Sequence, residues 1–315
     1  TWEGAESTLR EKLPDLQQYL AQQTAYLTSS MEKRGGGVTG IQLKSFQKEA
    51  PGLFQLLVQF ETVDSMGANF INSVLEAYAS WLPEYFQSRG LQQHPLVIMA
   101  ILSNYTPECK VKATVQFPAA EMGRFPGGLK GLEFAEKFAQ AIRIATVDPY
   151  RATTHNKGIF NGIDAVVIAT GNDFRAVESA GHAYAARSGQ YRSLSECTIE
   201  DGIFHFSLEI PLAIGTVGGL TTLHPLAQRS LELLGNPSAR ELMEIIAATG
   251  LAQNFAAVRS LVTTGIQSGH MKMHLGNILH HLQATESQTA AAQLHFQNHP
   301  ISHRAVAEFL AECKP

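Results

Sequence analysis

The sequence has few of the features that mark secreted, membrane-bound or nucleic-acid-binding proteins. Its three cysteines, Cys109, Cys197 and Cys313, are too far apart for a metal site and odd in number for a disulfide framework. The formal net charge of −4 leaves no broad basic surface for nucleic acid. No apolar run reaches the length of a membrane span, and no signal peptide is visible. The first residue is a threonine and not a methionine, so we expect the chain shown to begin inside a longer protein. We therefore expect a cytoplasmic protein without a nucleic-acid or membrane partner.

The composition that remains is typical of a globular protein with a sizeable core. Hydrophobic residues make up 44% of the chain and charged residues 17%, and its length suggests about two domains. Apolar periodicity predicts helices over 5–34, 70–85, 129–145, 174–186, 225–234, 238–249 and 251–264, followed by a helical, His-rich tail over 277–315. Strands are predicted over 41–43, 53–63, 96–102, 111–117, 163–169 and 204–210. This order predicts an α/β (α+β) fold.

The stretch from Lys157 to Asp173 places a cation and a carboxylate on either side of the predicted strand 163–169. A buried lysine beside a carboxylate can keep its charge and stabilise an oxyanion. Spacing alone favours a different interpretation, in which Lys157 is a surface residue and Asp173 caps a helix whose first turn holds residues 175–178.

Three other patterns carry candidate chemistry. Gly35-Gly36-Gly37 is typical of a flexible linker or of a close backbone approach. The turn at 64–69 lies between a strand and a helix, as in many phosphate sites, but lacks the G-x-G-x-x-G spacing. His270 and His274, four residues apart, could share a helix face and bind a metal, although no carboxylate or cysteine nearby offers a further ligand.

Eleven short motifs occur in a single order along almost the whole chain. They are Gly35-Gly-Gly37, Asp64-Ser-Met-Gly-Ala-Asn69, Ile101-Leu-Ser-Asn104, Asp148-Pro-Tyr-Arg-Ala152, His155-Asn-Lys-Gly158, Asn161-Gly162, Ala169-Thr-Gly-Asn-Asp173, Gly218-Gly219, His224-Pro225, Leu251-Ala-Gln-Asn254 and Gly265-Ile-Gln-Ser-Gly-His-Met271. Together they resemble hydroxymethylglutaryl-CoA reductase, and its soluble bacterial class more closely than its membrane-anchored eukaryotic class.

The resemblance implies reduction of 3-hydroxy-3-methylglutaryl-CoA to mevalonate and CoA by two hydrides, or the same chemistry in the oxidative, mevalonate-degrading direction. By their match to family positions, Lys157 stabilises the oxyanion, Asp173 tunes the lysine, and His270 protonates the departing thiolate. His274 matches no catalytic position, and no metal is implied. A metal-dependent enzyme that uses both histidines is a competing hypothesis.

The resemblance also assigns binding residues. Those that match substrate contacts are Arg151, Asn104 and Asn161. Those that match contacts of the nicotinamide cofactor are Asp64, Met66, Gly67 and Asn69. NADH-preferring members carry an aspartate seven residues before the triple glycine, where this chain has Thr28. Because Lys33 and Arg34 lie close by, we expect NADPH, with NADH possible.

One catalytic position of the family has no match. The family carries a glutamate well upstream of the triple glycine, and Glu3, Glu6 and Glu11 do not correspond to it. We expect that the native protein has this part of the large domain and that the chain shown lacks it. The alternative is a catalytically inactive paralogue that binds CoA or a nucleotide.

The resemblance implies three parts. These are a small cofactor-binding domain over 1–107, inserted into a larger domain; the substrate domain over 108–264, built around a central helix and without its N-terminal part; and a helical flap over 265–315 that carries His270. It also implies a homodimer or higher homo-oligomer with the active site at the subunit interface.

Overall fold

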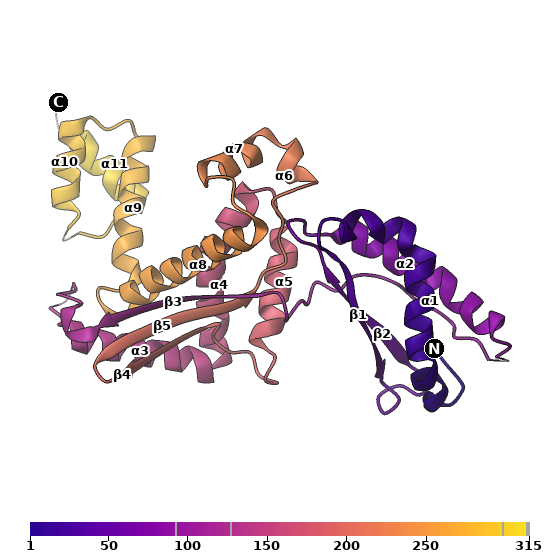
Figure 1. Ribbon diagram of the computed structural model, residues 1–315. Helices are drawn as coiled ribbons and strands as arrows, with labels where there is room; N and C mark the ends of the chain where they lie inside the picture. Colours follow the sequence, from indigo (N-terminus) through magenta and orange to yellow (C-terminus); the bar gives the residue numbers. More distant parts are fainter. Residues whose placement is uncertain (92, 127, 298, 313–315) are drawn as a thin grey trace. The chain divides into compact units, whose positions relative to one another are not determined.

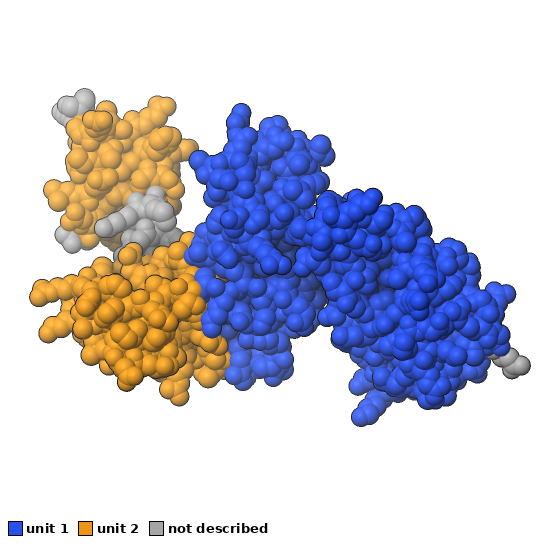
Figure 2. Space-filling model, viewed as in Figure 1, with its two compact units in different colours: residues 1–113, 160–194, 209–250 blue, residues 114–159, 195–208, 251–315 orange. Residues whose placement is uncertain are grey.

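The computed structural model describes residues 1–91, 93–126, 128–297 and 299–312, and of residues 266–273 it describes the backbone alone. The chain is a mixed α/β structure (Figure 1), which confirms the predicted class. It divides into two compact units (Figure 2). One unit comprises residues 1–113, 160–194 and 209–250, and the other 114–159, 195–208 and 251–315. The division into 1–107, 108–264 and 265–315 stays a prediction.

Two helices and a hairpin form the N-terminal layer of the first unit (Figure 1). The elements are α1 (Glu6–Glu32), β1 (Gly37–Ser45), β2 (Phe54–Glu61) and α2 (Ala68–Ser88). The strands pair antiparallel, with Gly37 opposite Glu61, and the helices bury Leu20, Val74 and Phe86 against them. The predicted helix and hairpin are thus confirmed. A Cβ on Gly36 would lie 2.5 Å from the carbonyl oxygen of Glu61, so the triple glycine permits a close backbone approach.

The strand predicted over 96–102 is wrong, because the structure shows no strand there. Leu96 exchanges backbone hydrogen bonds with Thr1. Met99 and Ile101 are 75% and 67% exposed. An apolar, β-branched segment favours a strand only where a neighbouring backbone pairs with it.

A second sheet has three strands, with β5 in the middle. Its strands are β3 (Lys110–Pro118), β4 (Ser195–Glu200) and β5 (Ile203–Pro211), ordered β3-β5-β4. The strands predicted over 111–117 and 204–210 are confirmed, whereas β4 was missed. A short 3-10 helix η1 (Ala119–Glu121) precedes α3 (Gly131–Val147), which packs on β4. In the second unit Phe138 of α3 makes edge contacts with Phe204 and Phe206 of β5, with ring centres 5.4 and 5.1 Å apart. The core of this unit therefore lies between α3 and the sheet.

The strand predicted over 163–169 is also wrong, because these residues are the last turns of helix α4 (Pro149–Ala169). The buried residues of α4 recur at helical spacing: Ala152, His155, Ile159, Ile163 and Val167. The β-branched run resembles a strand locally, but burial of one stripe along the whole helix decides its conformation.

The predicted helices over 238–249 and 251–264 form one helix, α8 (Ala239–Val262), which continues through Gly250. Among the described residues α8 alone is long and apolar enough to cross a membrane by length and composition, which corrects the expectation that no apolar run is that long. Such a helix is often the core helix of a globular protein. In α8 Leu242, Ile246 and Val258 are buried along its length.

Shorter helices complete the fold. They are α5 (Phe174–Ala185), α6 (Leu220–Leu223), α7 (Pro225–Leu233), α9 (Ile266–His281), α10 (Glu286–His295) and α11 (His303–Glu312). The last three pack around Leu279, Phe296 and Val306, so the helical tail is confirmed.

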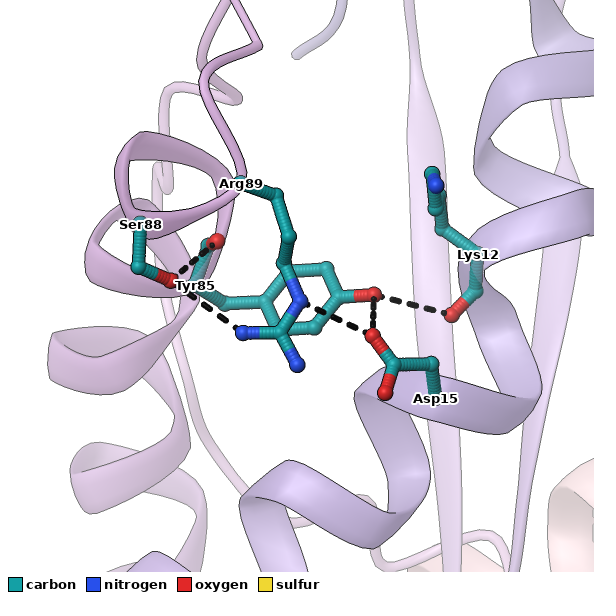
Figure 3. A network of polar contacts seen from close by, with 5 residues as sticks. All are labelled: Lys12, Asp15, Tyr85, Ser88 and Arg89. Atoms are coloured by element: carbon teal, nitrogen blue, oxygen red, sulfur yellow. Dashed lines mark hydrogen bonds and ion pairs between the residues drawn. The ribbon is translucent and has the colours of Figure 1, made fainter.

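A polar network ties α1 to α2 in the first unit (Figure 3). Asp15 Oδ2 accepts hydrogen bonds from the Tyr85 hydroxyl at 2.7 Å and from Arg89 Nε at 2.8 Å. The Arg89 guanidinium also lies 4.2 Å from the centre of the Tyr85 ring. Burial of the ring and the neighbouring carboxylate raise the pKa of Tyr85 to about 12, so the hydroxyl stays protonated and donates.

We predict that Tyr85→Phe lowers the midpoint of thermal unfolding by roughly 2–4 °C, because it leaves Asp15 without its buried donor while keeping the ring. Tyr26→Phe is the matched control, since Tyr26 lies on α1 and is 71% exposed. Thermal unfolding followed by circular dichroism measures both variants. Equal midpoints for the two would show that the network does not stabilise the helix pair.

Candidate functional site

Helix α4 presents several of the predicted residues at its surface. Lys157 and Asn161 are exposed and, four residues apart, share one face of the helix. Arg151 is half-buried, and burial lowers the pKa of its guanidinium from its ordinary value. The buried stripe on the other side of α4 is what turns Lys157 and Asn161 outward. The structure thus places a lysine ammonium and an amide where a ligand can reach them.

Asp173 is the N-cap of α5, as spacing alone had indicated. Its side chain accepts a hydrogen bond from the Arg175 backbone N–H at 3.0 Å and pairs with the guanidinium of the same residue at 2.9 Å. Arg175 thereby holds the pKa of the Asp173 carboxyl below its usual range. Lys157 belongs to the second unit and Asp173 to the first, so their pairing stays a prediction.

The turn at 64–69 is anchored by the first unit's own backbone. Asp64 Oδ1 accepts a hydrogen bond from the Ala239 N–H at the start of α8, at 2.8 Å, and the Asp64 carbonyl accepts one from the Thr216 N–H, also at 2.8 Å. A Cβ on Gly215 would lie 2.5 Å from Met66 N. The Asp64 carboxylate is therefore an anchor of the turn, held at a helix N-terminus where negative charge is stabilised.

The same turn opens onto the N-terminus of α2. Gly67, the N-cap, has φ +78°, and a Cβ there would lie 2.4 Å from Thr62 Cγ2, so the position requires glycine. No side-chain hydrogen bond caps this helix end. Asn69 is exposed and Met66 half-buried. Backbone N–H groups at a helix N-terminus bind phosphate, so this turn fits a nucleotide cofactor.

The residues expected to select the cofactor lie in α1. Thr28 is 4% exposed and lies on the buried face of the helix. Lys33 and Arg34 follow at its C-terminal end and are exposed. The positive charges, rather than the Thr28 hydroxyl, are therefore accessible to a ligand.

The remaining predicted residues are distributed over other elements. Asn104 is exposed in the loop before β3. His270 lies within α9, and its side chain is outside the described residues. His274 is exposed. No group of three His, Cys, Asp or Glu side chains suitable for a metal occurs among the residues whose side chains are described.

Two clusters of polar side chains were missed, the first half-buried and the second buried. Asp164 on α4 lies beside Glu178 on α5, and burial together with that neighbouring carboxylate raises the pKa of Asp164 to about 7. The second cluster joins His155, Ser195 and Asn254. The available signal for the first cluster was a carboxylate inside an apolar run, since Asp164 interrupts residues 163–169. For the second cluster it was the presence of His155 and Asn254 in two of the family motifs.

Comparisons with known proteins agree on one family. Residues 5–275 match the family model described as hydroxymethylglutaryl-coenzyme A reductase. The chain is 38% identical over 245 residues to 3-hydroxy-3-methylglutaryl-coenzyme A reductase of Archaeoglobus fulgidus, covering 78% of this chain and 53% of that protein. It is 35% identical over 257 residues to the probable enzyme of Borreliella burgdorferi, covering 82% and 57%. The chain thus spans a little over half the length of these relatives.

Solved structures of the same name are also similar. A class II 3-hydroxy-3-methylglutaryl-CoA reductase from Streptococcus pneumoniae, bound to NADPH in open conformations, matches with a TM-score of 0.70 at 39% identity, covering 80% of this chain and 66% of that one. A second structure of the enzyme from that organism matches with a TM-score of 0.70 at 38% identity, covering 94% and 69%.

We predict that Gly215→Ala destabilises the turn at 64–67 by roughly 1–3 kcal/mol, because the new methyl group meets backbone that cannot move away. Hydrogen exchange of the turn amides and thermal unfolding measure this effect. Gly276→Ala is the control, since a Cβ there meets nothing within 4 Å and alanine favours a helix. Unchanged exchange at residues 64–67 in Gly215→Ala would contradict the packing described.

Proposed function

Because the chain belongs to the hydroxymethylglutaryl-coenzyme A reductase family, we propose that its protein reduces 3-hydroxy-3-methylglutaryl-CoA to mevalonate and CoA. Two reduced nicotinamide cofactors and two protons are consumed, and the C–S bond of the thioester is broken. The observation that carries the proposal is α4, which holds Lys157 and Asn161 on one exposed face, within motifs of that family.

Lys157 acts on the thioester carbonyl. Hydride addition to the carbonyl carbon turns its oxygen into an oxyanion, and a nearby ammonium stabilises that charge as it develops. Asp173 keeps its charge, since Arg175 lowers its pKa, and a charged carboxylate beside Lys157 favours the ammonium form of the lysine. We assign stabilisation of the oxyanion to Lys157. We assign to Asp173 the role of keeping this lysine in its ammonium form.

Arg151, Asn161 and Asn104 bind the glutaryl end of the substrate. This end carries a free carboxylate and a tertiary hydroxyl, which match a guanidinium and two amides as hydrogen-bonding partners. Desolvation of the half-buried Arg151 strengthens its attraction for a carboxylate.

His270 supplies the proton for the departing CoA. When the hemithioacetal collapses, the sulfur leaves as a thiolate, which would add back to the aldehyde unless it is protonated. Histidine is the side chain whose ordinary pKa suits a proton donor near neutral pH.

The nicotinamide cofactor, when bound, supplies hydride to the carbonyl carbon. The exposed Asn69 and the backbone of Met66 and Gly67 at the N-terminus of α2 would hold it, while Asp64 keeps the turn in place. The similar Streptococcus pneumoniae enzyme binds NADPH, and the accessible Lys33 and Arg34 suit a 2′-phosphate.

The proposal extends to the setting of the enzyme. We place it in the cytoplasm, as a homodimer or higher homo-oligomer with the active site at the subunit interface. The glutamate that the family carries upstream of the triple glycine has no match among the residues of this chain. The oxidative, mevalonate-degrading direction is the second candidate, since the same residues serve both directions.

We predict that Lys157→Ala and His270→Ala each lower kcat in the full-length protein by at least about 100-fold, because each removes a group that acts on the reacting atoms. Oxidation of NADPH that depends on 3-hydroxy-3-methylglutaryl-CoA, followed at 340 nm, measures the rate. Lys137→Ala is the control, an exposed lysine on α3. Binding of the thioester without turnover in the wild type would favour the inactive paralogue, and loss of activity on chelation would favour the metal-dependent enzyme.

We predict a lower KM for NADPH than for NADH. Lys33 and Arg34 are exposed, and no carboxylate at position 28 repels a 2′-phosphate. Replacing Lys33 and Arg34 together with alanine is expected to raise the KM for NADPH about 10-fold and to leave the KM for NADH unchanged. A wild-type protein with a strong preference for NADH would refute this assignment.

A further inference from the structure

Three buried polar side chains meet in the second unit, each from a different element. His155 lies on α4, Ser195 is the first residue of β4, and Asn254 lies on α8; they are 2%, 0% and 1% exposed. Three such groups can be buried together at low cost only if they satisfy one another's hydrogen bonds. His155 contacts Ser195, and Ser195 contacts Asn254, at hydrogen-bonding distance.

The orientation of the Asn254 amide sets the direction of the hydrogen bonds in the cluster. Ser195 Oγ donates its single hydrogen to Asn254 Oδ1 at 2.8 Å. The contact of 2.8 Å between His155 Nε2 and Ser195 Oγ then requires the ring to donate. Asn254 Nδ2 lies 3.4 Å from the same ring nitrogen, which is too long to compete with the two shorter contacts. In this arrangement His155 carries a hydrogen on Nε2.

The surroundings keep this ring neutral. Burial, and to a smaller extent the charge of Arg151 one turn earlier on α4, lower the pKa of His155 to about 3. A ring that titrated near neutral pH would gain a second donor hydrogen and a charge inside the core. The arrangement is thus constant over the physiological pH range.

The position of His155 links this cluster to the proposed site. Lys157 follows two residues later, so about 200° of helix rotation separates the two side chains. Arg151 precedes His155 by one turn. Fixing His155 against β4 and α8 therefore fixes the rotation of α4 that points Lys157 out of the core.

We propose that the His155–Ser195–Asn254 cluster is a positioning device that sets the rotation of α4 and so presents Arg151 and Lys157 to the CoA thioester, an inference that rests on the proposed function. None of the three touches substrate. Rotation of a helix by 10° moves the end of a lysine side chain by about 1 Å, and a displacement of about 1 Å can cost about 100-fold in rate.

The test compares His155→Leu with His155→Gln in the full-length protein. Leucine fills the site without a donor, whereas the glutamine amide can place its Nε2 hydrogens where the ring Nε2–H was. We expect kcat to fall 10- to 100-fold in His155→Leu and to recover to within about 3-fold of the wild type in His155→Gln. The dissociation constant for NADPH should be unchanged in both variants, and the number of NADPH molecules bound per chain counts the folded protein.

Thr249→Val is the matched control on α8. The Thr249 hydroxyl donates a hydrogen bond within the helix to the Ile245 carbonyl at 2.8 Å. We expect the Thr249→Val variant to change stability and to keep the wild-type kcat. If His155→Leu lowers the midpoint of unfolding but keeps the wild-type kcat per NADPH-binding protein, the cluster stabilises the fold and the positioning role is refuted.

Two further measurements separate this inference from the proposed function. If the wild type binds the thioester without turnover, the proposed function fails, and the positioning role is judged by thioester affinity, which should weaken at least 10-fold in His155→Leu and stay constant in Thr249→Val. Nitrogen-15 NMR of the wild type should show a neutral Nε2–H ring for His155 from pH 5 to 8. A ring that titrates near pH 6.5 would overturn the inference, and so would equal thioester affinity in all variants of a protein without turnover.

Discussion

The hydrogen bonds that hold His155 in the core are the constraint on which the proposed site depends. A polar ring can occupy a buried position only with partners that replace water, and Ser195 and Asn254 supply them. With that face of α4 buried, helix geometry sends Lys157 outward. The exposed Lys157 thus owes its accessibility to the buried His155 on the opposite side of the same helix.

The residues of the turn at 64–69 divide in the same way, on different elements of the fold. The Asp64 carboxylate accepts a hydrogen bond from the first backbone N–H of α8. Gly215 allows its own segment to approach the backbone of the turn closely. What remains available to a ligand is the N-terminus of α2, with Asn69 exposed beside it. In both regions, residues of one motif divide into anchors, which satisfy the protein's own backbone or core, and contacts, which face outward.

This division explains why motif residues differ in what their substitution should do. Loss of an anchor such as Ser195 or Gly215 should alter geometry at a distance, whereas under the proposed function loss of Lys157 removes a charge from the reacting atoms. Asp173 combines both roles, because it caps α5 and remains ionised beside Arg175. Its substitution is therefore the hardest to interpret from rate alone.

The sequence by itself determined the family, the α/β class, the helices with a clear apolar stripe, the hairpin over residues 37–61 and the identities of the candidate residues, because periodicity and motifs are local properties. It did not determine that residues 163–169 are helical, that residues 96–102 form no strand, or that α8 runs through Gly250. Nor did it show that Asp64 serves as an anchor or that His155 finds Asn254. These outcomes were decided by tertiary structure, because the conformation of a β-branched run and the partner of a polar side chain depend on which distant segment is packed against them.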